Sequence, residues 1–215
     1  IKDQYTGIDW SAGMRTIKGL DALQFLRTRH GVGDGGDLGR ISNQQQYMSR
    51  LVSKLRSEEV LSNPATLYKL ASTTLRNVDP STSLTNPLTL VQIAMAVKDV
   101  PFNEIVFVQY PTYTDPSDPN RVVPDREAAD ALWSALAANQ PIQLSGNLSD
   151  GNGVVVDENA TPAPAATDAP APTDAPAPTD GATPTPEPSS SVITLPSEIA
   201  GQTAAQATCS NGNVR

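Results

Sequence analysis

Three arginines surround a glycine-rich loop in the stretch RTRHGVGDGGDLGRISNQ. Arg27 and Arg29 precede the loop, and Arg40 follows it. Because like charges repel, the arrangement predicts an anion between them, either the protein's own Asp34 and Asp37 or a ligand. A planar guanidinium group can bind two phosphate oxygens at once, so phosphate is the ligand to consider.

A helix is predicted directly after these glycines, over residues 38–57, where apolar residues recur at near-helical spacing. Asp37 stands where an N-cap belongs, and aspartate is a preferred capping residue. Arg40 and Gln44 are four residues apart and therefore share one face. Arg40 lies in the first turn, where backbone N–H groups are unpaired and the helix dipole is positive. Preceding glycines would let the backbone approach a phosphate closely.

The same residues also fit a surface without a ligand. Arg29 with Asp34, and Arg40 with Asp37, can form surface ion pairs worth less than about 1 kcal/mol each. The glycines can form a flexible turn, and the loop matches neither the GxxxxGK[ST] phosphate loop nor a GxGxxG dinucleotide turn. An anion site and a solvated surface therefore both stay open at this point.

The elements that must position the loop are mainly helices. A short helix is predicted over residues 21–27, and Arg27 and Arg29 can converge only if it ends between them. Asn-Pro pairs, which are typical helix starts, and a final apolar pattern predict three more helices. These lie over about residues 63–76, 86–98 and 124–138.

Residues 105–110, IVFVQY, form the best predicted strand, because they are β-branched and aromatic and a proline follows. One strand cannot make a sheet, so either the fold is mostly helical or the partner strands lie upstream of Ile1, and the second is expected. The predicted fold class is α/β, with several helices and few strands. In the last helix, Leu132, Trp133 and Leu136 are predicted to face a core.

The composition changes near residue 143. Residues 1–143 carry a net charge of −1 and residues 144–215 one of −7, so the acidity belongs to the C-terminal part. Residues 160–188 consist largely of Ala, Pro, Thr and Asp, with TDAPAP as a repeated unit. Such a sequence cannot bury enough apolar area to offset its chain entropy. We therefore predict one domain over 1–143 and a disordered low-complexity tail over 144–215.

The remaining residues favour no other chemistry. His30 is the only histidine and Cys209 the only cysteine, which argues against a zinc site and excludes an intramolecular disulfide. Cys209 is predicted to be a free thiol in the tail. The sequence has no GxSxG nucleophile motif and no long basic stripe, which argues against a serine hydrolase and a nucleic-acid-binding protein. Its longest apolar run is too short to cross a bilayer.

The ordered residues around the loop resemble the LytR-CpsA-Psr family of bacterial cell-envelope phosphotransferases. The family pattern is an Ala-Leu pair, an Arg-x-Arg pair, a short loop, Asp-x-x-Arg and a glutamine four residues later. The resemblance continues to about Leu136. The matching residues are Ala22, Leu23, Arg27, Arg29, Asp37, Arg40 and Gln44.

The resemblance implies an α/β sandwich around a mixed sheet, with an apolar tunnel for a polyprenyl chain. It also implies an extracytoplasmic enzyme, anchored in the membrane of a Gram-positive-type bacterium, that transfers a glycopolymer from a polyprenyl-pyrophosphate carrier to peptidoglycan. By this resemblance Arg27, Arg29 and Arg40 hold the pyrophosphate. Gln44 adds a hydrogen bond, and Asp37 orients an arginine or caps the helix.

The resemblance is incomplete. Asn43 stands where the family usually has an arginine. The family's magnesium-binding aspartates and a further arginine belong to an N-terminal half that would precede Ile1. Mg²⁺ and a membrane anchor are thus expected for a full-length parent, with the metal ligands outside this chain. We expect this chain to be the C-terminal part of a catalytic domain that is inactive or impaired alone.

Two other functions stay open. One is a non-catalytic binding module that holds an anionic envelope lipid or polymer without turnover and keeps the three arginines. The other is a structural wall-interaction protein in which the tail matters most. The apolar residues of the helix over 38–57 are predicted to be core rather than to contact the polyprenyl chain, among them Ile41, Met48 and Leu51.

Overall fold

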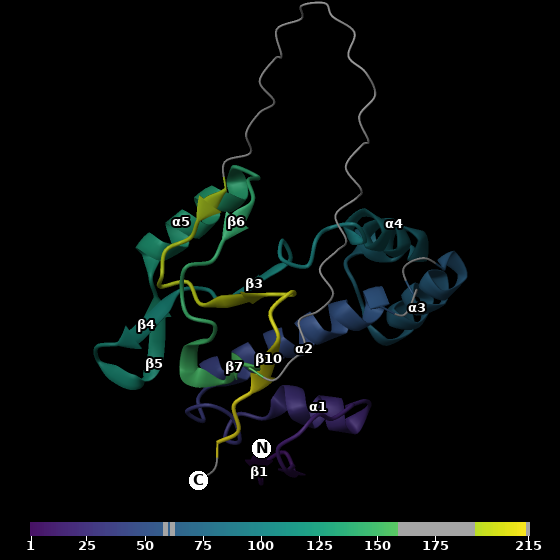
Figure 1. Cartoon of the computed structure of the whole chain (residues 1–215). Helices are drawn as coiled ribbons and strands as arrows, with labels where there is room; N and C mark the ends of the chain where they lie inside the picture. Colours follow the sequence, from purple (N-terminus) through teal and green to yellow (C-terminus); the bar gives the residue numbers. More distant parts are fainter. Residues whose placement is uncertain (58–59, 61–62, 159–191, 214–215) are drawn as a thin grey trace, which may run out of the picture.

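The computed structural model of the chain describes residues 1–57, 60, 63–158 and 192–213 (Figure 1). Each predicted helix is present in this part, with bounds within about two residues of those expected. None of the helices described there is long and apolar enough to cross a membrane. The α-helices are α1 Leu20–Arg27, α2 Asp37–Ser57, α3 Pro64–Asn77, α4 Pro87–Val97 and α5 Arg126–Ala137.

Two helices begin at side-chain caps that the Asn-Pro pairs signal. Asn63 Oδ1 accepts hydrogen bonds from the backbone N–H groups of Ala65 and Thr66 at the start of α3. The start of α4 repeats this arrangement, with Asn86 accepting from the Leu88 N–H group. These caps satisfy donors that a helix leaves unpaired at its first turn, so the Asn-Pro signature works as expected.

The described strands are short and pair two by two. The mixed α/β prediction is confirmed, with helices and small sheets rather than one continuous sheet. The pairs are β1 Lys2–Asp3 with β2 Ile8–Asp9, β3 Val106–Val108 with β9 Gly201–Thr203, β4 Thr112–Asp115 with β5 Asp118–Pro124, β6 Ile142–Gln143 with β8 Ile193–Thr194, and β7 Val154–Val156 with β10 Thr208–Ser210.

The best predicted strand, β3, finds its partner downstream. It pairs antiparallel with β9, and Phe107 lies opposite Gln202. The expectation that this partner precedes Ile1 is therefore wrong. The reason is that β9 reads GQT, which has neither the β-branched content nor the alternation that signals a strand.

The C-terminal residues 192–213, here called the strap, return to the domain and supply β8, β9 and β10. Figure 1 shows these yellow strands lying among the teal and green strands of the earlier chain. The described parts of 144–215 thus differ from the predicted disordered tail. The TDAPAP repeat lies within 159–191, outside the described residues. Cys209 is a free thiol, as predicted, but it is half-buried in β10 rather than in a loose tail.

Helix α5 and the strap share one hydrophobic core. The buried stripe on α5 leaves Trp133 and Leu136 on the outer side, where they are 57% and 50% exposed. The prediction that these two residues face the core is wrong, whereas that for Leu132 is confirmed. The core residues are Ala128, Leu132, Ala135, Leu195 and Ile199.

The buried face of α2 is polar. Gln46 is buried, and its Nε2 donates to the Thr208 carbonyl of the strap at 2.9 Å. Met48 is 45% exposed, and Ile41 and Leu51 are half-buried, so the predicted core face of this helix is wrong. These groups can be buried because they have hydrogen-bond partners: Gln46 bonds to the strap, Asn43 Nδ2 donates to the Phe25 carbonyl, and the Ser42 hydroxyl bonds to the Asp150 carbonyl. The buried polar residues are Ser42, Asn43, Gln46 and Ser49.

Two glycine turns interlock at the start of α2. A Cβ on Gly153 would lie 2.1 Å from the Gly39 carbonyl oxygen, and one on Gly33 would lie 2.1 Å from the Gly151 carbonyl oxygen. Gly33 and Gly151 also have φ of +53° and +68°, which favours glycine at both positions. The glycines of the loop therefore allow backbone to pack on backbone.

We expect Gly153→Ala to lower the free energy of unfolding by about 2 kcal/mol, because the added methyl group meets a rigid carbonyl. Gly39→Ala is the matched control, since its Cβ would lie 3.1 Å from the Gly151 oxygen across the same contact. Its crowding is offset by a gain of about 1 kcal/mol in helix propensity. Urea denaturation of both variants checks this; equal stabilities would contradict the interlocked packing.

Candidate functional site

Helix α1 ends between the first two arginines of the loop. Arg27 is its last residue, and Thr28 continues in an extended conformation. Asp3, from β1, holds this break, because its Oδ2 accepts hydrogen bonds from the Thr28 hydroxyl at 2.6 Å and from the Arg29 N–H group at 3.2 Å. The helix end that convergence of the arginines requires is therefore present.

Asp3 is a buried carboxylate, 2% exposed. Burial raises its pKa, but hydrogen bonds from the Thr28 hydroxyl and from the N–H groups of Tyr5 and Arg29 outweigh this, aided by the charge of His30. The net result is a pKa below the ordinary value of 3.8. Asp3 is thus a fixed negative charge that anchors the backbone of Arg29. Sequence reasoning missed this role, because a single Asp near Ile1 belongs to no motif.

Side chains of α2 hold the end of α1 in place. Gln44 Nε2 donates to the Leu26 carbonyl at 2.9 Å, and Asn43 Nδ2 donates to the Phe25 carbonyl at 3.2 Å. These carbonyls belong to the last turn of α1, where helix acceptors lack partners. Asn43, at the position where an arginine was expected, is fully buried. The hydrogen bond from Asn43 to α1 explains why an amide stands at this position. The predicted role of Gln44 in ligand binding stays a prediction.

Arg40 and Asp37 form a pair at the start of α2. The helix begins at Asp37 itself, and its Oδ1 lies 2.7 Å from Arg40 Nη2. The side chain of Asp37 is 53% exposed and that of Arg40 37%, so the pair is worth less than about 1 kcal/mol and can be displaced. Arg40 Nε is buried and has no hydrogen-bond partner within the described part of the chain. Arg40 therefore keeps an unused donor close to its exposed tip.

The other two arginines are exposed. Arg29 Nη2 lies 3.3 Å from the ring Nε2 of His30, rather than pairing with Asp34. The His30 ring in turn lies against Tyr5, with 4.8 Å between ring centroids. Arg27 ends the last turn of α1, next to the Leu26 carbonyl that Gln44 holds. The structure thus places the predicted residues at the end of α1, just after it and at the start of α2, and leaves arginine side chains accessible.

The backbone of the glycine loop is already hydrogen-bonded within the protein. The Gly33 N–H group donates to the Asn211 carbonyl at 2.8 Å, and the Asp34 N–H group donates to the Gly151 carbonyl at 2.9 Å. The Gly36 N–H group donates to Asp34 Oδ1 at 2.7 Å. These N–H groups of the loop are therefore already paired within the protein and are not free to cradle an anion.

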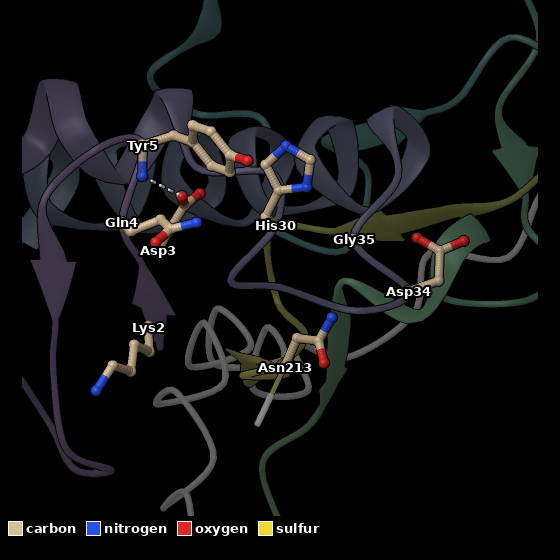
Figure 2. A pocket seen from close by; sticks show the side chains of 8 residues that line it. All are labelled: Lys2, Asp3, Gln4, Tyr5, His30, Asp34, Gly35 and Asn213. Carbon is tan, nitrogen blue, oxygen red and sulfur yellow. Dashed lines mark hydrogen bonds between the residues drawn. The ribbon is translucent and has the colours of Figure 1, made fainter. Parts of the chain in front are cut away.

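A cavity of about 470 Å³ opens beside the loop (Figure 2). Figure 2 shows Tyr5 and His30 on one side of it and Asp34 and Asn213 on the others. The charged groups that line this cavity include the Lys2 ammonium group and the carboxylates of Asp3 and Asp34, and the three arginines do not line it. Its walls are Lys2, Asp3, Gln4, Tyr5, His30, Asp34, Gly35 and Asn213.

The described residues contain no cluster of metal-ligating side chains. Within 1–57, 60, 63–158 and 192–213, no group of three or more His, Cys, Asp or Glu is placed to hold a metal ion. Asp34 and Asp37 are engaged with the Gly36 N–H group and with Arg40. No chemical step through a metal follows from these side chains.

We expect Asp3→Asn to lower the free energy of unfolding by about 2 kcal/mol at pH 7, because a hydrogen-bonded buried charge is lost. Since the folded-state pKa of Asp3 is lowered, its stabilisation is present above pH 3.8 and disappears as the pH falls through the folded pKa. The difference between the two proteins should therefore shrink in acid. A difference independent of pH, measured by denaturation between pH 7 and pH 3, would contradict this.

Asp150 provides a control, because its pKa is shifted in the opposite direction to that of Asp3. Burial raises its pKa above 3.8, so its ionisation opposes folding at neutral pH. We expect Asp150→Asn to raise the free energy of unfolding at pH 7 and to lose this advantage as the pH falls to about 3.8, where the unfolded chain also becomes protonated. A loss of stability in Asp150→Asn at pH 7 would contradict the assignment.

Comparison with known proteins identifies relatives for part of the chain. It is 41% identical over 78 residues to the cell wall biosynthesis protein LcpA of Corynebacterium glutamicum. The matched residues make up 36% of this chain and 15% of LcpA, so the similarity covers a small part of that relative. No solved structure shows significant similarity to the chain.

The family comparison covers far more of the chain. The sequence model of the LytR_cpsA_psr family matches residues 1–138, which include α1 to α5, the glycine loop and all three of its arginines. This range also contains the Arg-x-Arg and Asp-x-x-Arg residues around which the site is built. The chain belongs to the LytR_cpsA_psr family.

Proposed function

We propose that the protein acts in bacterial cell-wall assembly, as part of a transferase that moves a glycopolymer from a polyprenyl-pyrophosphate carrier to peptidoglycan. Family membership supports this proposal, as does the similarity to a protein named for cell wall biosynthesis. Such a reaction joins two envelope polymers, so we place it outside the cytoplasmic membrane.

The observation that carries the proposal is the pairing of accessible arginine side chains with a fixed backbone. Asp3 holds the backbone of Arg29, and the first turn of α2 holds Arg40. Guanidinium groups held in this way can neutralise the charge on a pyrophosphate without rearrangement of the main chain. Preorganised positive charge is the main contribution that a protein makes to phosphoryl transfer.

Binding would exchange one partner of Arg40 for another. The Asp37 carboxylate now occupies Arg40 Nη2, but this exposed pair is weak. A pyrophosphate carries more charge and offers several oxygens, so it can displace the carboxylate and form bidentate contacts. Reorientation of the side chain would also give Arg40 Nε, now without a partner among the described residues, an acceptor.

The described side chains supply binding rather than the whole of the chemistry. The phosphate chemistry of the proposed reaction normally uses a divalent cation, and we propose Mg²⁺ with ligands other than the described side chains. Under the proposal, this chain contributes the pyrophosphate-binding arginines Arg27, Arg29 and Arg40, with Asp37 orienting Arg40. A non-catalytic module for anionic envelope lipid or polymer is the second candidate, because the same arginines would bind such a ligand without turnover.

We expect Arg29→Ala and Arg40→Ala each to weaken the binding of a polyprenyl-pyrophosphate analogue by about tenfold, the effect of losing a charge-assisted hydrogen bond. Arg121→Ala is the matched control, because Arg121 is an exposed arginine that pairs with Asp118 in the β4–β5 hairpin. Calorimetric titration measures all three variants. Unchanged affinity in both loop variants, or an equal loss in the control, would overturn the proposed site.

A further inference from the structure

The strap is joined to the rest of the described fold through contacts at both of its ends and along its length. Between its first residue and residue 158 the chain runs through 159–191, the stretch with the TDAPAP repeat. All three strap strands pair with strands from residues 106–156, one of them parallel and two antiparallel. Each strap strand thus completes a two-stranded sheet with one strand of the earlier chain, through the same kind of backbone pairing by which extended peptides bind to strands.

The strap is also anchored by side chains that are almost completely buried. Leu195 is 1% exposed and Ile199 is fully buried, and both lie against α5. Gln202 and Thr208 are buried together, with the Thr208 hydroxyl donating to Gln202 Oε1 at 3.0 Å. Pockets for apolar side chains and backbone pairing together give such a segment a specific position.

The last residues of the strap hold the glycine loop. The Asn213 N–H group donates to the Gly31 carbonyl at 2.8 Å, and the Asn211 carbonyl accepts from the Gly33 N–H group at 2.8 Å. Between these two bonds, Val32 is fully buried and forms an antiparallel bridge with Gly212. The loop between Arg29 and Arg40 is therefore paired to the strap as if it were a short strand.

The strap holds α2 as well. Its Thr208 carbonyl accepts hydrogen bonds from Gln46 Nε2 at 2.9 Å and from Arg50 Nη2 at 2.8 Å. The Ser210 hydroxyl lies between the amide oxygens of Asn43 and Gln46 and can donate to one at a time. Removal of the strap would leave these groups without their partners. The free-energy penalty of an unpaired buried polar group is larger than the net contribution of the hydrogen bond to stability.

We propose that the strap is a positioning element for the arginine loop, and that it works as a docked peptide whose covalent link through 159–191 is dispensable. Its backbone fixes Gly31, Val32 and Gly33, and thereby the spacing between Arg29 and Arg40. The link to anion binding rests on the proposed function. The docking itself rests on the contacts alone.

The first test cuts the full chain. A specific protease site replaces one TDAPAP unit, residues 173–178, and the purified protein is cleaved there. We expect the strap to stay bound during size-exclusion chromatography, with slow hydrogen exchange at the Gly33 and Asp34 N–H groups as in the uncut chain. Separation of the strap on cleavage would overturn the proposed docking, and slow exchange and pyrophosphate affinity that persist after its loss would overturn the positioning role.

The second test weakens docking in the same cleavable protein. Ile199→Asp places a charge in the buried core, whereas Val192→Asp makes the same change at an exposed strap residue and serves as the control. After cleavage we expect only Ile199→Asp to release the strap. Exchange at Gly33 should then rise by about 100-fold, because its protecting bond is lost. Affinity for pyrophosphate should fall by about tenfold, because Arg29 and Arg40 are then no longer held at the spacing that suits the anion.

A synthetic peptide of residues 192–213 separates loss of positioning from general unfolding. Added to the stripped protein, it should restore both the slow exchange and the pyrophosphate affinity. Failure of the peptide to restore either readout, while the amides of α3 and α4 stay protected, would overturn the proposal. If the uncut protein binds no pyrophosphate, the proposed function fails, and hydrogen exchange still decides whether the strap positions the loop.

Discussion

Contact of backbone with backbone at the glycine loop is the constraint on which the rest of the structure depends. Gly33 and Gly39 on one side meet Gly151 and Gly153 on the other at distances that leave little or no room for a Cβ atom. This contact covers one side of the first turn of α2 and thereby fixes the position of the Arg40 backbone. The same loop is paired to the strap, so three separate stretches of chain meet there. The accessible arginines stand on this interlocked base.

In this arrangement the backbone of the loop stabilises the fold, and the arginine side chains stay available to bind an anion. The N–H groups of Gly33, Asp34 and Gly36 are hydrogen-bonded within the protein, and Asp3 supplies a buried negative charge that holds the backbone of Arg29. The guanidinium groups of Arg40 and Arg29 are only weakly paired, since Arg40 forms an exposed ion pair with Asp37 and Arg29 contacts the His30 ring. A rigid frame with loosely paired cations suits the recognition of a highly charged anion, as the proposed pyrophosphate would be.

The helices could be predicted well from the sequence because caps and apolar spacing are local signals. Asn63 and Asn86 cap where expected, and α1 ends between Arg27 and Arg29. Prediction failed for the strap, since GQT and TCS carry no strand pattern and gain their form from β3 and β7. It also failed for the buried face of α2, where the Gln46 amide donates to a strap carbonyl and the Asn43 amide to a carbonyl of α1. Of the site, the arginine pattern could be recognised, but the anchoring role of Asp3 depends on contacts distant in sequence.

The most direct measurement of the central claim is an arginine Nε–Hε spectrum recorded during titration of the full chain with inorganic pyrophosphate. We predict saturable shifts at Arg29 and Arg40, with Arg40 Nε moving into a hydrogen-bonded environment and Arg121 unchanged. Backbone signals of Gly33 and Asp34 should stay close to their starting positions, because their partners lie within the protein. Absence of saturable shifts at both loop arginines, or large shifts confined to the loop N–H groups, would contradict the claim.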